Sequence, residues 1–235
     1  MSAQGGDVPA LLPVAFTPLQ TPGELMAQAK VPESDVEASR DAEALCALAR
    51  YVAEFLTAGH PDLGRPGAVC PFAAGAMKSG LLQITSCDLD KVDEEALTFA
   101  IDQFRGMFRP LSAESQKNKD EIYRSVVIVF PRLPTDTGPA LIEQVQKKLK
   151  PAFVQQNLMI GEFYPDCPAP GIHNAEFRPL RTPVTSIAIR RITLFDAPFM
   201  LDDAQCLASY QNRFGEAGRI RIQKLLDARA INVPV

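Results

Sequence analysis

Apolar residues recur at helical spacing in several segments of the chain, which predicts amphipathic helices. The first is expected to run from a cap at Ser34 or Asp35 to about Ala58, because Gly59 follows as a stop signal. Its inward face carries Leu45, Leu48, Val52 and Phe55. Other helices are expected over residues 72–78, 90–108, 139–151 and 202–212, with an amphipathic stretch after the last.

Short apolar runs predict the strands. Ser125–Phe130 reads SVVIVF and is almost wholly apolar, which is typical of a central strand covered on both faces. Further strands are expected over Leu81–Cys87, Leu158–Tyr164 and Val184–Ile192, the last two without a crossover helix between them. This order favours an α+β fold: a mixed or antiparallel sheet of about four to five strands, with helices packed on one side.

The first 32 residues differ from the rest of the chain. They are rich in Gly, Pro, Ala and Thr and lack periodicity, so an extended N-terminal arm is expected over residues 1–32. The arm can pack on the body through Leu11, Leu12, Val14 and Phe16. Residues 33–235 are then expected to form a single α+β domain.

Composition excludes several classes of protein. The net charge is −4 and no basic run exists, so nucleic acid is not an expected partner. No run approaches the roughly 18 apolar residues of a membrane span, and no signal or transit peptide fits, so a cytoplasmic protein is expected. The five cysteines include no CxxC pair, and reduced thiols are expected.

The loop from His60 to Phe72 places an imidazole, a guanidinium and a thiol on a backbone rich in Gly and Pro. Cys70 precedes a helix start, where a thiolate is favoured as a nucleophile or a soft metal ligand. The alternatives are structural. Cys70 can be a small buried residue, His60 a helix cap, and Arg65 a donor to loop carbonyls.

The stretch from Gly161 to Arg181 is the second candidate region. It supplies Tyr164 at a strand end, His173, and the pair Arg178 and Arg181, which suits a carboxylate or phosphate. The alternative for the arginines is salt bridges to nearby carboxylates. The chain lacks GxGxxG, GxxxxGK[ST], GxSxG and HExxH, which argues against dinucleotide, P-loop, α/β-hydrolase and zincin functions.

Two motifs, HPDLGRPGAVCPF and LMIGEFYPDCPAPGIHNAEFRPLR with the following AIR, resemble a bacterial domain family of unknown function over about Tyr51 to Leu201. That family usually has a histidine where this chain has Tyr164. More remotely, the order of a Cys-Pro-Phe-like loop before a helix, a strand ending in a His-Pro pair and a later Phe/Arg-rich segment is similar to haem-dependent guanidine N-hydroxylases of the guanitoxin-pathway type.

The second resemblance implies an oxidoreductase with noncovalent haem b, acting on a small amine or amino-acid derivative in a biosynthetic pathway. It implies an axial iron ligand from His60, His173 or Cys70, with Tyr164 near the iron. The propionate partners implied are Arg65, Arg178 and Arg181.

Two other functions stay open. The chain can be a cofactor-free enzyme in which Cys70 is the nucleophile and His60 or His173 the base. It can also be a non-catalytic binding or assembly module, with the arm and the C-terminal helix as its interface and a homodimer as one form of it.

Overall fold

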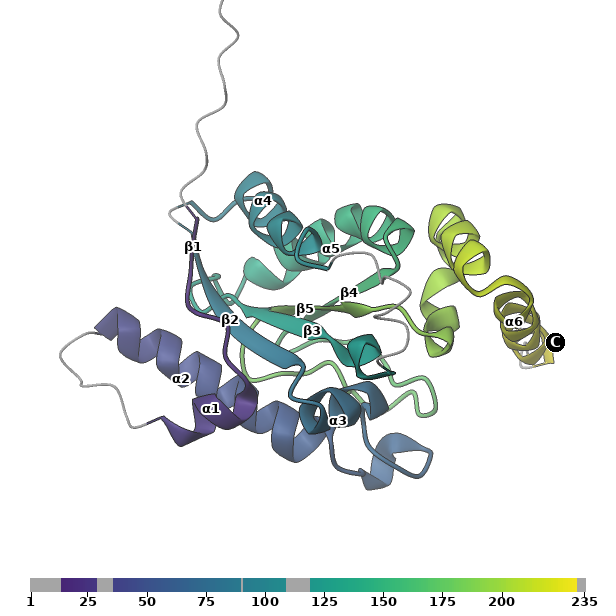
Figure 1. Ribbon diagram of the computed structural model, residues 1–235, viewed down its shortest axis with the longest axis horizontal. Coiled ribbons are helices and arrows are strands. Elements are labelled where there is room, and N and C mark those ends of the chain that lie inside the picture. The colour runs from purple at the N-terminus through teal and green to yellow at the C-terminus, as the bar shows by residue number, and fades with distance from the viewer. Residues whose placement is uncertain (1–13, 29–35, 90, 109–118, 232–235) are drawn as a thin grey trace, which may run out of the picture.

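The protein is described by a computed structural model that covers residues 14–28, 36–89, 91–108 and 119–231. At its centre is a five-stranded mixed sheet of order β1-β2-β3-β5-β4 (Figure 1). The strands are β1 Val14–Phe16, β2 Leu82–Leu89, β3 Ser125–Val129, β4 Leu158–Phe163 and β5 Ser186–Arg191. Parallel β2 and β3 are flanked by antiparallel β1 on one side and β5 and β4 on the other.

Strand β3 lies in the middle of the sheet, and all five of its residues are buried. Val126 and Ile128 face one hydrophobic cluster, while Val127 and Val129 face another. The SVVIVF run therefore forms the central strand that its uninterrupted apolar character predicts. The α+β class and the mixed sheet are confirmed.

Helices cover both faces of the sheet, so the expectation of helices on one side is wrong. One face packs against α4 (Glu94–Arg105) and α5 (Gly138–Gln155). The other face packs against α2 (Val36–Arg50), whose axis continues as the π-helix η1 (Tyr51–Leu56), and against α3 (Pro71–Lys78) (Figure 1). The physical reason is that β3 is apolar on both sides, and each side requires its own cover.

Residues 14–28 pack on the body, with Phe16 among the expected anchors, but they form a strand and a helix where an extended segment was expected. Phe16 in β1 packs edge to face on Phe104 of α4, with ring centroids 4.9 Å apart. Helix α1 (Pro22–Ala27) begins with a capping box between Thr21 and Glu24 and buries Leu25 against α2. Six residues are too few to show helical periodicity, and the expectation missed α1 for that reason. The predicted anchors at positions 11 and 12, and the caps at positions 34 and 35, lie outside the described residues.

Helix α5 does not end at Pro151 as expected but continues to Gln155. Proline there removes one hydrogen bond to the carbonyl four residues earlier. The next turn buries Phe153 and Val154 almost completely, and this burial offsets the missing bond.

The C-terminal part of the chain lies beyond the β4 edge of the sheet (Figure 1). The 3-10 segment η4 (Leu194–Met200) follows β5, and α6 (Ala204–Ile231) packs on it. Gly215, with φ of 55° and ψ of −131°, breaks α6 into two helical parts. The two parts share one cluster through Tyr210 and Ile222. No helix among the described residues is long and apolar enough to cross a bilayer.

Candidate functional site

A long groove of about 2040 Å³ runs along the end of β5 and the β4 edge. Its walls come from the loop before α3, the loop between β4 and β5, η4 and part of α6. Several of its apolar side chains are open to solvent, including Ile172 at 59% and Phe195 at 71% exposure. The groove is large enough for a cofactor or a small-molecule substrate.

The two loops singled out in the sequence pack against each other beside this groove. Phe177 lies against the His60 ring, with centroids 4.8 Å apart, and joins Leu63 and Val69 in a small cluster. The Asn174 side-chain amide donates to the carbonyl of Asp62 at 2.8 Å. The structure thus brings together two regions that are about a hundred residues apart.

Cys70 lies at the N-terminus of α3 and lines the groove. Its Sγ accepts the backbone N–H of Ala73 at 3.4 Å, and its side chain is half-buried. The next residue, Pro71, is the first of the helix and has no N–H to satisfy. A thiol in this position receives the positive end of the helix dipole.

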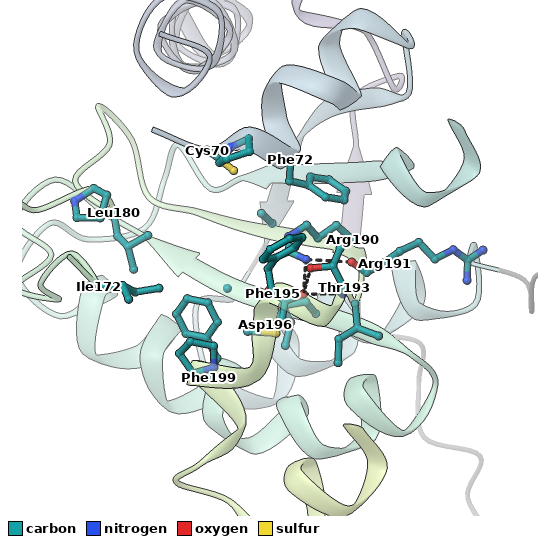
Figure 2. A pocket seen from close by; sticks show the side chains of 18 of the residues that line it. Cys70, Phe72, Ile172, Leu180, Arg190, Arg191, Thr193, Phe195, Asp196 and Phe199 are labelled. Carbon is teal, nitrogen blue, oxygen red and sulfur yellow. Dashed lines mark hydrogen bonds and ion pairs between the residues drawn. The ribbon is translucent and has the colours of Figure 1, made fainter. Parts of the chain in front are cut away.

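Beside Cys70 lies a rigid ion pair that the sequence reasoning did not select. The Arg190 guanidinium donates to both carboxylate oxygens of Asp196, at 2.8 and 2.5 Å, and stacks on the Phe72 ring at 4.7 Å (Figure 2). Thr193 donates its backbone N–H and its hydroxyl to the same carboxylate. Asp196 is only 2% exposed, so the pair is fixed in place.

The pKa of Arg190 is raised even though burial acts to lower it. The hydrogen bonds and charge of Asp196 raise it, and the Cys70 thiolate charge adds to the effect. Cys70 and Arg190 both line the groove, and Arg190 stacks on Phe72, two residues after Cys70. The sequence signal for this pair was the charged end of an apolar strand, in the AIR segment of the motif.

The groove has the opposite charge balance to the whole protein. Among the described residues, seven Lys and Arg side chains line it against four Asp and Glu. The chain as a whole has a net charge of −4. The groove is therefore a cationic feature on an acidic protein, which favours anionic ligands.

The two histidines are placed differently. His173 is exposed and lines the groove, whereas the His60 ring packs between Phe55 and Phe177 outside the groove lining. His60 Nδ1 also accepts the backbone N–H of Asp62, so this side chain caps the 3-10 turn η2 (Pro61–Leu63). The sequence alternative made His60 a cap at the end of the preceding helix, whereas the structure shows it capping the start of the following 3-10 turn.

The three predicted anion-binding arginines donate to backbone carbonyls. Arg65 lines the groove but bonds the carbonyls of Pro66 and Val69 at 3.0 and 3.1 Å. Arg178 donates to Ala175 and Phe177, and Arg181 donates to Cys167. Neither Arg178 nor Arg181 lines the groove. The arginines that do line it, besides Arg65, are Arg190, Arg191, Arg213 and Arg221.

Tyr164 lies on the other face of the sheet. It is 5% exposed in the cluster shared with α5, and its hydroxyl donates to the Glu143 carboxylate. Burial raises the pKa of Tyr164, and the bond to Glu143 raises it further. Tyr164 does not line the groove.

The groove meets the needs of a haem only in part. It has the volume, and His173 and Cys70 line it as candidate iron ligands. The predicted propionate partners Arg178 and Arg181 are outside it, and Arg65 is engaged with its own loop. Within the described residues, no group of three or more His, Cys, Asp or Glu side chains could hold a metal ion.

An α+β domain with a cationic groove is the class that fold and site define. The family model described as Domain of unknown function (DUF6875) matches residues 45–224, and the chain belongs to that family. The sequence expectation of a domain family of unknown function is thereby confirmed. Comparisons with curated proteins and with solved structures find no match.

Proposed function

We propose that the groove is the active site of a small-molecule enzyme in which Cys70 is the nucleophile. The observation that carries this proposal is the position of the Cys70 sulfur, at the start of α3, on the groove wall and beside Arg190. The Ala73 amide and the Arg190 guanidinium both present positive charge to the sulfur. The thiolate is the attacking form of cysteine, and positive groups beside the sulfur suit a nucleophilic role.

The other groups of the groove have roles that suit this chemistry. The ion pair with Asp196 holds Arg190 still, so its charge is already in place when a substrate arrives. His173 lines the same groove and is the candidate for moving a proton to or from the bound substrate. A free thiol nucleophile agrees with the expected cytoplasmic location, where thiols stay reduced.

Competitive alkylation tests the proposal with an internal standard. Cys46 is half-buried like Cys70, but its Sγ donates to the Leu25 carbonyl and does not line the groove. We expect iodoacetamide at neutral pH to label Cys70 at least about tenfold faster than Cys46, because the Cys70 sulfur faces the groove at a helix N-terminus whereas the Cys46 sulfur is held against a backbone carbonyl. Peptide mass spectrometry measures both rates in one sample.

The Cys70→Ser variant, checked for unchanged circular dichroism, assigns the fast phase to Cys70. Equal labelling of the two thiols, or slower labelling of Cys70, contradicts a nucleophilic role. The remaining three cysteines are buried and are expected to react only on unfolding.

A haem-dependent redox enzyme acting on a small amine or amino-acid derivative is the second candidate, and exposed His173 on the wall of a large groove favours it. Bound haem would supply oxygen activation at iron. His173 or Cys70 would hold the iron, while the groove arginines would hold the propionates. Of these, Arg213 is exposed to solvent.

Titration of the protein with hemin separates the two candidates. A saturable Soret band at about one haem per chain, shifted by His173→Ala, supports the haem enzyme and names its ligand. A spectrum equal to that of free hemin contradicts the haem enzyme. The alkylation rates then decide the Cys70 proposal on their own.

A further inference from the structure

Part of the groove has a floor formed by the sheet itself. On the side of the sheet that packs against α2 and α3, Ile84 of β2 and Val129 of β3 are completely buried. Ala188 of β5 contacts the same cluster, but it is only half-buried and lines the groove. Gly161 of β4 pairs with Ala188, is also half-buried and also lines the groove. The sheet is therefore open to the groove where β5 and β4 run side by side.

Gly161 calls for an explanation, because a glycine inside a strand weakens the strand. A bulge does not explain it, since the pairing of β4 with β5 runs residue for residue from Leu158 to Phe163. A positive φ does not explain it either. A Cβ on Gly161 would meet only the Phe163 ring among the described residues, at an ordinary contact distance of 3.7 Å, so no neighbouring backbone requires a glycine. The remaining reason for a glycine in a strand is the close approach of a ligand.

The walls around this floor are apolar and largely aromatic. Phe72, Phe195 and Phe199 line the groove, and the last two are 71% and 41% exposed. Ile172 also lines it and is 59% exposed. Figure 2 shows Cys70 and Phe72 on one side of the groove and Ile172 and Phe199 on the other. Exposed apolar side chains around a concave surface are typical of a ligand site.

Charge narrows the class of ligand. Among the described residues, more basic than acidic side chains line the groove, although the chain as a whole is acidic. A ligand with an anionic group is therefore favoured. The rings of the walls favour an apolar body that is itself aromatic, because aromatic rings pack on one another in offset or edge-to-face contacts.

We propose that Gly161 and Ala188 form the floor of a subsite for an aromatic anion, a small molecule with a flat ring system and one acidic group. Two neighbouring strands with no side chain larger than a methyl group offer a flat surface on which such a ring lies face down. As a substrate class this ligand rests on the Cys70 proposal, but its binding does not. Alkylation rates test Cys70 and ligand binding tests the floor, so either can fail without the other.

Fluorescence titration with anilinonaphthalene sulfonate (ANS) tests the subsite, because ANS is an aromatic anion whose emission rises in apolar surroundings. We expect the full folded chain to bind about one ANS molecule saturably. Sodium naphthoate should displace ANS at a lower concentration than sodium decanoate or uncharged naphthol. Equal or better displacement by decanoate contradicts a flat ring, and equal or better displacement by naphthol contradicts the anionic group.

Gly161→Val is the main variant, because it fills the space above the floor with a residue type that strands favour. We expect it to weaken ANS binding about tenfold, while the urea midpoint of unfolding stays equal to that of wild type or rises. Ala188→Val raises the same floor from β5 and should weaken ANS binding as well. This combination of weaker binding and undiminished stability distinguishes a ligand contact from a structural glycine.

Gly23→Val is the matched control. A Cβ on Gly23 of α1 also meets nothing within 4 Å among the described residues, and Gly23 lies outside the groove lining. This variant should bind ANS as wild type does. Absence of saturable ANS binding to wild type, or undiminished binding by both Gly161→Val and Ala188→Val, overturns the proposal. A lowered urea midpoint for Gly161→Val with unchanged ANS affinity would mark a structural glycine and overturns it too.

Discussion

At the scale of single residues, the roles in the groove depend on what each polar atom is bonded to. The arginines that the sequence marked as anion binders donate their hydrogen bonds to loop carbonyls, whereas Arg190 donates to the Asp196 carboxylate. Residue type was readable from the motifs, but bonding partners were not. A guanidinium in a Pro/Gly loop and one at a strand end look alike in a sequence, and only tertiary packing distinguishes them.

At Gly64 the first loop passes close to the backbone of His173 in the second loop. Gly64 has φ of +74°, and a Cβ there would lie 2.7 Å from the carbonyl oxygen of His173. Gly80 shares the positive φ of +65° but has nothing within 4 Å. We expect backbone strain to lower the free energy of unfolding of both Ala variants by about 1–2 kcal/mol. The clash should lower that of Gly64→Ala by about 1–3 kcal/mol more.

Urea unfolding of the two variants measures the difference. Equal destabilisation of Gly64→Ala and Gly80→Ala would mean that the loop carrying His173 is not held against the first loop. That result would also remove the structural basis for a shared site.

Glu162 of β4 gives a pH-dependent prediction. Burial raises its pKa above the ordinary 4.5, and the charge of Glu143 adds to the increase. The folded state then binds the proton more tightly than the unfolded chain, so the stabilising contribution of protonated Glu162 is complete below about pH 4.5 and is lost as pH rises through the raised folded pKa.

Glu162→Gln should therefore gain stability relative to wild type on going from about pH 4 to about pH 7.5. Chemical denaturation at the two pH values measures this. Glu216→Gln, on the exposed surface of α6, controls for the loss of one negative charge. A difference between Glu162→Gln and wild type that stays constant with pH contradicts the partly buried position of this carboxyl group.

At the scale of elements, the helices and strands with long periodic patterns were predictable. Strands β2, β3, β4 and β5 and helices α2 to α5 all lie close to their predicted ranges, because each carries enough apolar residues to show its period. Helix α1 was not predictable from periodicity, although its capping box was present in the sequence. The apolar run SVVIVF implied that helices cover both faces of the sheet. Which helix packs on which face could not be predicted, because that depends on the three-dimensional topology.

The capping box of α1 gives a test of how firmly residues 21–27 belong to the body. Thr21→Ala removes the side-chain bond to the Glu24 amide and should cost about 1 kcal/mol of stability. Thr137 occupies the same N-cap position in α5 but makes no capping bond with its side chain. Thr137→Ala should change stability by less than about 0.5 kcal/mol, and equal effects of the two variants would argue against a docked α1.

At the scale of the whole molecule, the charge of the groove differs in sign from the net charge of the chain. The chain is acidic, yet the groove beside Cys70 is cationic among the described residues. The sequence showed scattered arginines and no basic run, and therefore gave no sign of this surface. Folding gathers Arg190, Arg191, Arg213 and Arg221, from β5 and α6, along one groove. Such a field attracts small anions over a distance of about one Debye length, roughly 10 Å at 0.1 M salt.

The most direct test compares iodoacetate with iodoacetamide as reagents for Cys70 and Cys46. The two reagents deliver similar groups, but only iodoacetate is negatively charged. We predict that the iodoacetate to iodoacetamide rate ratio at low salt is several-fold higher at Cys70 than at Cys46, and that the excess shrinks as salt is added, because the groove field is screened. A ratio that is the same at both thiols, at every salt concentration, would contradict a cationic site around Cys70.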